Sequence, residues 1–227
     1  MPLELDIQPS DVDFLETLQQ CKNSVVFKVS IHGKLRVMKV YHDRGISEWD
    51  PVDYEVNLFL RESTAYQRLK QKGFCTRGVV PDFYGTLTNI QPTSWPNLYM
   101  FVDDKLPPNA IFIEYIPGMS KLDLSNYSPS NVNRLRDILF EMHQTKMLHG
   151  DSMPRNMMIC SGQENRVLWL DFDSAQTFPE DEALTTRQER WVAEEVELMD
   201  YFVDGLAQDN DEGRLNCTYS YYYDWFV

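Results

Sequence analysis

Residues 148–156 read Leu-His-Gly-Asp-Ser-Met-Pro-Arg-Asn, and residues 170–173 read Leu-Asp-Phe-Asp. Between them, short apolar segments flank a polar turn at residues 161–165, which predicts two strands joined as a hairpin. Asn156 stands at the start of the first strand, and Asp171 follows the second. A hairpin of this kind brings Asn156 and Asp171 side by side, so the interpretation of the chain begins with this pair.

The chemistry of this pair favours a hard metal ion. Asp171 offers a carboxylate and Asn156 offers an amide oxygen, and Mg²⁺ prefers oxygen ligands while it keeps waters and substrate phosphates in its shell. Asp151 lies on the loop before the hairpin, where it would face a metal-bound phosphate as a base or an orienting group. The alternative is that all three are loop caps or turn residues, but their joint spacing favours the functional interpretation.

The ordered motifs resemble those of the protein-kinase-like superfamily, in particular its branch of small atypical kinases and aminoglycoside phosphotransferases. The family pattern is H-x-D-x-x-x-x-N, followed by an apolar strand pair and by D-F-G or a variant of it. The resemblance implies that Asp151 is the catalytic aspartate and that Asn156 and Asp171 bind Mg²⁺. It extends from about Phe14 to Phe178 and implies an ATP-dependent phosphotransferase.

The resemblance also assigns roles in the first half of the chain. Lys39 lies in the apolar segment Val37–Val40, like the lysine that contacts the ATP phosphates in kinases. A buried ammonium needs a counter-ion, and the family supplies a glutamate from the next helix. Glu62 fits that position, with Glu55 as the second choice, and we expect Lys39 and Glu62 to lie within about 4 Å of each other.

The segment Ile113-Glu114-Tyr115-Ile116 resembles the hinge that holds adenine in kinases. The resemblance implies that main-chain groups of Glu114 and Ile116 bond the adenine edge. It also implies that the Ile113 side chain lines the nucleotide pocket.

Positive charge for the transferred phosphate is expected from Arg155. Many kinases carry a lysine two residues after the catalytic aspartate, where this chain has Met153. Tyrosine kinases instead often place an arginine directly before the asparagine, as Arg155 is placed here. The alternative is an ion pair of Arg155 with a nearby carboxylate. We expect His149 to brace the loop by hydrogen bonds. Asp173, in place of the glycine of D-F-G, is expected to serve the backbone conformation, with a second metal-facing carboxylate as the alternative.

Two departures from the family pattern leave a second hypothesis open. The phosphate-covering loop of kinases is rich in glycine, whereas Gln19–Ser24 contains none. The part after Asp171 has no A-P-E motif and is too short for the full peptide-binding half of a typical protein kinase. The alternative is a pseudokinase, a nucleotide-binding or structural scaffold that acts through a partner protein. For an enzyme, the acceptor would be a hydroxyl group of an unknown protein or small molecule, and another ATP-using transfer is a third hypothesis.

We expect an α+β protein with a bilobal, protein-kinase-like fold and a shortened C-terminal lobe. The N-terminal lobe would span residues 1–115, as an antiparallel sheet with one main helix, and the mainly helical C-terminal lobe residues 116–227. The last segment, 216–227, is rich in aromatic residues and is expected to dock on the C-terminal lobe. The pattern predicts a proline-rich loop at 89–109, strands at 24–30, 35–41, 83–88, 110–116, 156–160 and 166–170, and helices at 53–72, 130–145 and 187–206.

The composition argues against several classes of protein. The 227 residues carry 35 acidic and 21 basic side chains, a net charge of −14, without a basic cluster that would bind nucleic acid or an anionic membrane surface. Apolar runs are too short for a membrane-spanning helix, and the N-terminus lacks the pattern of a secretory signal. The four cysteines form no C-x-x-C pair, which favours a reducing environment. We therefore expect a cytoplasmic protein that binds neither nucleic acid nor membrane.

Overall fold

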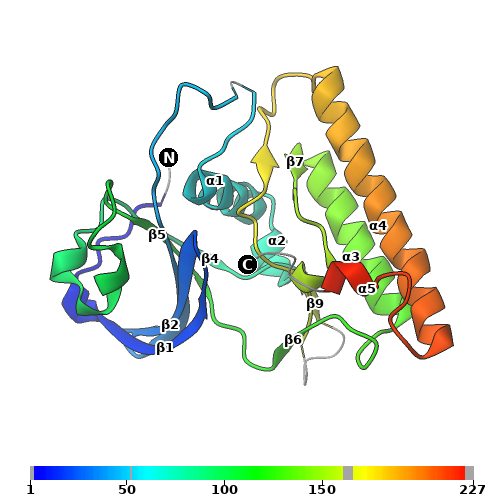
Figure 1. The fold of residues 1–227 in the computed structure, drawn as a ribbon, viewed down its shortest axis with the longest axis horizontal. Helices are drawn as coiled ribbons and strands as arrows, with labels where there is room; N and C mark the ends of the chain where they lie inside the picture. The colour runs from blue at the N-terminus through cyan, green and yellow to red at the C-terminus, as the bar shows by residue number, and fades with distance from the viewer. Residues whose placement is uncertain (1–2, 52, 161–165, 223–227) are drawn as a thin grey trace.

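The computed structural model describes residues 3–51, 53–160 and 166–222. The predicted turn at 161–165 and the last five residues of the aromatic C-terminal segment lie outside the described residues. The architecture is α+β, as predicted. A five-stranded antiparallel sheet occupies one end of the molecule, and the helices α3 (Pro129–Gln144) and α4 (Thr186–Glu212) occupy the other (Figure 1). Helix α1 (Leu58–Gln71) lies between them.

The five-stranded sheet has the order β1-β2-β3-β5-β4, and every neighbouring pair in it is antiparallel. Its strands are β1 (Val12–Gln20), β2 (Ser24–Ile31), β3 (Lys34–Tyr41), β4 (Phe83–Leu87) and β5 (Asn109–Glu114). The predicted hairpin of β2 and β3 is confirmed, with Ile31 paired to Lys34. Its turn residues, His32 and Gly33, both have left-handed backbone, as the tightest hairpin turns require.

The last four residues of β3 are buried on both faces of the sheet, which places Lys39 inside the protein. Met38 and Val40 point to one face, where they pack against the loop that precedes β5. That loop contains the 3-10 turns η2 (Pro92–Ser94) and η3 (Pro96–Phe101), and it buries Trp95, Leu98 and Phe101. Since successive strand residues alternate between faces, Lys39 and Tyr41 project toward the other face, against which α1 packs.

The helix boundaries follow capping residues. Asn57 accepts a hydrogen bond from the Leu60 N–H at 3.1 Å, so α1 begins later than its predicted start at residue 53. The predicted helix at 130–145 is confirmed as α3, which has Ser128 as its cap and Pro129 in its first turn. α4 continues beyond its predicted end at residue 206, and Gly213 then ends it with left-handed backbone.

Two small sheets lie beside the long helices. One contains β6 (Met119–Lys121), β8 (Met157–Cys160) and β9 (Val167–Trp169), and the other pairs β7 (Met147–Leu148) with β10 (Gln176–Thr177). β8 and β9 are the two predicted strands, and they are antiparallel neighbours. The sequence missed β6, β7, β10 and the one-turn helices α2 (Phe74–Arg77) and α5 (Tyr219–Tyr222), because such short elements show no periodicity. It also missed β1, an edge strand that is mostly exposed and so lacks a buried apolar face.

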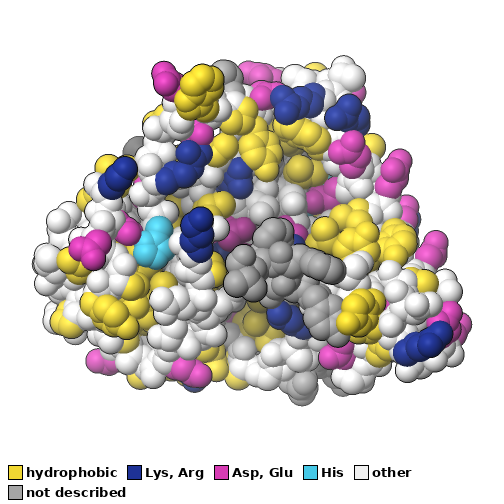
Figure 2. Space-filling model, viewed as in Figure 1, with side chains coloured by type: hydrophobic (Ala, Val, Ile, Leu, Met, Phe, Trp, Pro, Cys, Tyr) yellow, Lys and Arg dark blue, Asp and Glu magenta, His cyan; other side chains and the backbone are white. Residues whose placement is uncertain are grey.

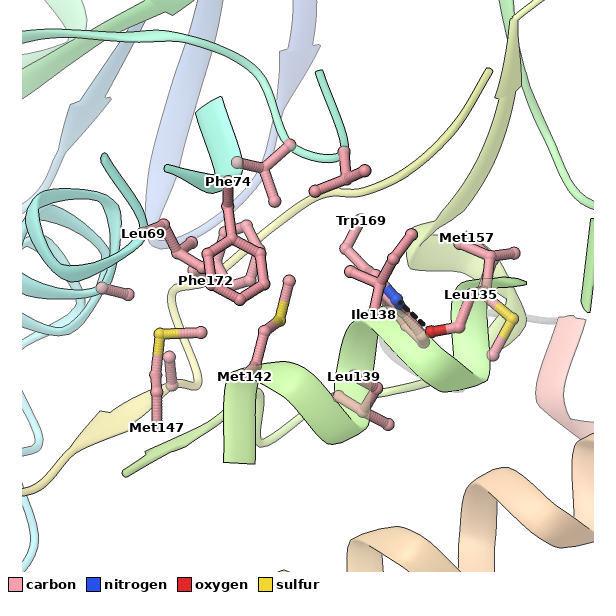
Figure 3. Close-up of a cluster of buried hydrophobic side chains, with 14 of the residues drawn as sticks. Leu69, Phe74, Leu135, Ile138, Leu139, Met142, Met147, Met157, Trp169 and Phe172 are labelled. Atoms are coloured by element: carbon pink, nitrogen blue, oxygen red, sulfur yellow. Dashed lines mark hydrogen bonds between the residues drawn. The ribbon is translucent and has the colours of Figure 1, made fainter. Parts of the chain in front are cut away.

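A cluster of buried apolar side chains holds the β8–β9 hairpin against α1, α2 and α3 (Figure 3). Leu69, Phe74 and Met142 gather around Phe172, which has no exposed surface. The indole N–H of Trp169 on β9 donates to a main-chain carbonyl of α3 at 2.9 Å, so this buried polar group is satisfied. The packing of Phe172 fixes the position of the two aspartates that flank it.

No helix in the described part of the chain is long and apolar enough to cross a membrane. On the face drawn in Figure 2, basic side chains are scattered, and acidic side chains lie among them. Basic side chains of the described residues therefore form no cluster on this face.

Candidate active site

Three carboxylates surround the ammonium group of Lys39. Its Nζ atom lies 2.7 Å from Glu62 Oε2, 2.5 Å from Asp171 Oδ1 and 3.2 Å from Asp173 Oδ2. The Glu62 side chain is only 1% exposed, whereas the Asp171 side chain is 40% exposed. The cluster is therefore closed to solvent at Glu62 and open to solvent at Asp171.

The members of this cluster come from three separate elements. Lys39 lies on β3, Glu62 lies on α1, and the two aspartates follow β9. The distance between Lys39 and Glu62 falls within the range expected from the sequence. The carboxylate of Glu55, the second choice, instead accepts from the main-chain N–H of Asn57 at 2.8 Å.

Burial and charge shift the titration of these groups in different directions. Burial lowers the pKa of Lys39, but the charges of Asp171 and Glu62 outweigh burial and hold that pKa well above its ordinary value. Burial raises the pKa of Glu62 to about 7, against the opposing effect of Lys39. Burial also raises the pKa of Asp173, whereas at Asp171 the charge of Lys39 outweighs burial and lowers the pKa. Near neutral pH, Lys39 is therefore charged while Glu62 titrates.

Tyr41 belongs to the site, although the motifs did not predict it. Its hydroxyl donates a hydrogen bond to Glu62 Oε2, the oxygen that Lys39 also contacts. The main-chain N–H of Phe172 donates to the other oxygen, Oε1, at 3.4 Å. Three donors thus orient the Glu62 carboxylate. The signal in the sequence was the spacing, because Tyr41 follows Lys39 by two residues and so lies on the same face of β3.

The backbone role expected first for Asp173 is wrong. The left-handed backbone falls on Asp171, with a φ of 63°, and Asp173 is not among the described non-glycine residues with positive φ. Asp173 instead directs its carboxylate to Lys39. The Arg61 side chain donates to the main-chain carbonyl of Asp173 at 3.3 Å, which helps to hold this turn. The D-F-D sequence therefore adds a negative charge at Lys39 that the glycine of D-F-G cannot supply.

The carboxylate of Asp151 is held by two neighbours from its own loop. Arg155 contacts both oxygens, with Nε 3.1 Å from Oδ2 and Nη2 2.5 Å from Oδ1. The side-chain N–H₂ of Asn156 donates to Oδ2 at 2.7 Å. Arg155 thus forms the ion pair that was named as the alternative, and its partner is Asp151 itself.

The loop that carries Asp151 adjoins the turn that carries Asp171. The Leu170 N–H donates to the Asn156 carbonyl at 3.0 Å, so the hairpin places Asn156 beside the residue before Asp171. The buried His149 donates from Nε2 to the Leu170 carbonyl at 3.1 Å, and its Nδ1 accepts from the Asp151 N–H at 3.3 Å. The expectation that His149 braces this loop by hydrogen bonds is confirmed.

Glu195 on α4 anchors the same loop and was not predicted. Its carboxylate accepts from the main-chain N–H groups of His149 at 3.1 Å and Gly150 at 2.7 Å, and it lies 2.7 Å from Nε2 of His143. Burial raises the pKa of Glu195, but these hydrogen bonds and histidine charges outweigh burial and lower it. A signal was present, because Glu195 precedes the buried Met199 by one helical turn.

The predicted hinge residues lie at the end of β5. Ile111 pairs with Lys39 across β3 and β5, and Ile113 follows two residues farther along the same face. Ile113 and Ile116 are buried. The Glu114 N–H donates to the main-chain carbonyl of Asp82 at 2.8 Å and is therefore already used. A hinge role for Glu114 thus requires its own main-chain carbonyl.

The donor chemistry near Lys39 suits a hard cation. Carboxylate oxygens of Glu62, Asp171 and Asp173 all lie within 4.8 Å of one another. The side chain of Asn156 carries an amide oxygen, and the main-chain carbonyl of this residue accepts a hydrogen bond from the residue before Asp171. These donors are all oxygens, as Mg²⁺ prefers, so Asp171 and Asn156 fit that ion by their chemistry.

No family model matches the chain, and no curated protein has significant similarity to it.

Proposed function

We propose that the chain is an ATP- and Mg²⁺-dependent phosphotransferase of the protein-kinase-like type. In this proposal residues 1–115 form the N-terminal lobe, residues 116–227 form a shortened C-terminal lobe, and the acceptor is a hydroxyl group of a protein or small molecule. One observation carries the proposal: Lys39 lies within 3 Å of both Glu62 and Asp171. These three residues come from the sheet, α1 and the hairpin, which is the convergence that the kinase-like motifs imply.

The nucleotide would lie along β5 and β3. The Glu114 carbonyl and the Ile116 N–H would bond the adenine edge, and Ile113 would line the adenine pocket. The Lys39 ammonium would then contact the α- and β-phosphates, with Glu62 holding it in place. The raised pKa of Lys39 supports this role, because the group keeps its positive charge at neutral pH.

Asp171 and Asn156 would hold Mg²⁺, which neutralises phosphate charge when it is bound. Asp151 would orient the acceptor hydroxyl and accept its proton. Arg155 fixes the Asp151 carboxylate through two hydrogen bonds and places positive charge beside it. Because phosphoryl transfer depends mainly on positioning and electrostatics, this set of side chains would supply what the proposed reaction needs.

A transfer assay with γ-labelled ATP tests the proposal on a panel of proteins and small alcohols. Asp151→Asn preserves the size of the side chain and removes the base, so we expect label transfer to fall by about 100-fold or more. Asp204→Asn, an exposed aspartate on α4, makes the same charge change away from the site and should transfer label at the normal rate. Equal transfer by Asp151→Asn and by the unaltered chain would contradict the assigned role.

The pseudokinase scaffold is the second candidate, and the turn between β1 and β2 favours it. Cys21 closes this turn by donating its N–H to the Ser24 carbonyl at 3.0 Å, and no glycine lies in the turn. Side chains in this turn restrict the close approach of a phosphate to the backbone. Binding of ATP without transfer to any acceptor of the panel would support the scaffold over the enzyme.

A further inference from the structure

A cavity adjoins Asp151 on the side of α4. Its volume is about 260 Å³, just below the range typical for drug-sized ligands, so it suits a small molecule. Apolar side chains gather in the upper middle of the face in Figure 2, where the segment before α1 approaches the start of α4 in Figure 1. The residues that line the cavity include Tyr54, Asp151, Ser152, Met153, Trp191 and Leu198.

The outer wall of this cavity is built by two aromatic rings from distant parts of the chain. Tyr54, before α1, and Trp191, in α4, pack edge to face with ring centres 5.6 Å apart. An ion pair between Asp53 and Arg187, at 2.8 Å, fastens the same two segments. The wall thus joins the first half of the chain to α4 and gives the cavity an aromatic side of fixed geometry.

The charges around the cavity are compensated. Its three carboxylates each have a partner: Asp151 pairs with Arg155, Glu195 contacts His143, and Glu194 lies 3.2 Å from Arg190. Among the described residues, no lysine or arginine lines the cavity. An anionic ligand would meet three carboxylates but no lysine or arginine in the cavity lining. A cationic ligand would find every one of these carboxylates already paired. An uncharged ligand fits this balance best.

Ser152 supplies the polar group that points to a ligand. It is 1% exposed, and its hydroxyl has no hydrogen-bond partner among the described residues. A buried hydroxyl without a partner is costly, and such groups are rare in folded proteins. Ser152 lines the cavity directly beside Asp151, so a polar group of a bound molecule can satisfy it.

We propose that this cavity receives the acceptor, and that the acceptor is a small uncharged alcohol with an apolar body and a second polar group. This inference rests on the proposed function. The apolar body would lie against Tyr54, Trp191 and Leu198, and the second polar group would bond Ser152. The acceptor oxygen would form a bond to the γ-phosphorus of ATP while the bond to the β–γ bridging oxygen breaks. ADP would leave with that electron pair, and the hydroxyl proton would pass to Asp151.

Three matched probes that share a benzyl group test the inference by ligand-detected NMR on the full chain without nucleotide. Phenylpropanediol is uncharged, phenylalaninol is cationic and phenyllactate is anionic. We expect phenylpropanediol to bind more tightly than the two charged probes. Ser152→Ala should weaken its binding roughly three- to tenfold, the effect of one lost hydrogen bond. Ser94→Ala, an exposed serine away from the cavity, is the matched control and should bind as the unaltered chain does.

Trp191→Ala removes the aromatic wall and should weaken phenylpropanediol binding more than Ser152→Ala does. The inference is overturned if a charged probe binds more tightly than the diol, if the diol does not bind, or if Ser152→Ala has no effect. Transfer of phosphate to a serine peptide but to none of the probes would also overturn it.

Stabilisation by ATP and Mg²⁺, measured separately, distinguishes the two failures. If ATP and Mg²⁺ stabilise the chain and the diol does not bind, the acceptor inference fails alone. If the diol binds as expected but ATP and Mg²⁺ have no effect, the cavity is supported and the phosphotransferase proposal fails.

Discussion

Lys39 and Asp171 stand 132 positions apart in the sequence, yet the ammonium of one lies 2.5 Å from the carboxylate of the other. This contact joins the five-stranded sheet to the turn after β9, and Glu62 adds α1 to the same point. The cluster is therefore a product of the whole fold and of no single element. The function proposed for the cluster depends on this arrangement.

Glu62→Gln should change the pH dependence of stability. The pKa of Glu62 is raised from 4.5 to about 7 in the folded protein, so the folded state retains a proton that the unfolded state loses between these values. Stability should consequently fall as pH rises through this range, by an amount on the order of 3 kcal/mol. Glutamine does not titrate, so the variant should lose this part of the decline, while Asp173, whose pKa burial also raises, keeps its own contribution.

Chemical denaturation at roughly pH 5 and roughly pH 8 measures this difference. Asp171 and Glu195 have lowered pKa values, so their stabilising contributions are lost only at more acidic pH. The assignment is wrong if Glu62→Gln shows the same difference in stability between the two pH values as the unaltered chain.

Tyr41→Phe and Tyr66→Phe form a matched pair. Both hydroxyls are buried, but that of Tyr41 donates to Glu62, whereas that of Tyr66 has no partner among the described residues. Loss of a hydrogen bond to a charged group should cost Tyr41→Phe about 1.5 to 3 kcal/mol in free energy of unfolding. Tyr66→Phe should be neutral or stabilising. Similar costs for the two variants, measured by denaturation at a pH above the pKa of Glu62, would argue against the Tyr41 bond.

Gly150→Ala and Gly33→Ala separate backbone strain from a clash. Both glycines have left-handed backbone, with φ of +79° and +75°. A Cβ atom on Gly150 would lie 2.1 Å from the main-chain oxygen of Ser174, whereas one on Gly33 would meet nothing within 4 Å. Gly33→Ala should therefore cost about 1 to 2 kcal/mol, the price of the left-handed conformation.

Gly150→Ala should lower the free energy of unfolding by roughly 4 kcal/mol or more in the same denaturation experiment, a loss that few single substitutions cause. It should also abolish label transfer, because it separates the Asp151 loop from the turn that carries Asp171. Equal costs for the two glycine variants would show that the loop and the turn are not in contact.

Glu195→Ala should destabilise the chain by about 3 to 5 kcal/mol, because it leaves the buried N–H of His149, the N–H of Gly150 and the partner histidine without an acceptor. Glu194→Ala changes the adjacent, exposed glutamate and should alter stability by only about 0.5 kcal/mol. The free energy of unfolding at neutral pH provides the comparison. A cost for Glu195→Ala as small as that for Glu194→Ala would exclude Glu195 as the anchor of the loop.

Elements with complete local signals could be predicted from the sequence. The β2–β3 hairpin has alternating apolar residues and a glycine turn, and α3 has a serine cap followed by proline. The motif spacing also predicted Lys39, Glu62, Asn156 and Asp171 as candidate site residues. These residues belong to ordered patterns, so each supports the assignment of the others.

The rest depended on contacts between distant segments. The apolar residues of α4 predict a stripe through Val192, Val196, Met199, Val203 and Leu206. Met199 and Leu206 are buried as expected, but the buried face also includes the carboxylates Glu195 and Asp209. A pattern of apolar residues cannot identify a buried carboxylate, because the hydrogen bonds that allow it to be buried are not visible in the sequence. Asp173 was misjudged for a similar reason, since its attraction to Lys39 appears only when the hairpin reaches β3.

The most direct test of the central claim is a thermal-shift titration with ATP, with and without Mg²⁺, on the unaltered chain and on Asp171→Asn. We predict that Mg²⁺ increases the stabilisation by ATP, with a gain of about 2.7 kcal/mol when ligand reaches 100 times its Kd. Asp171→Asn should lose the part that depends on Mg²⁺, whereas the control Asp204→Asn should retain it. Stabilisation that is independent of Mg²⁺, or identical in Asp171→Asn and the unaltered chain, would contradict the assignment of this cluster as a metal–nucleotide site.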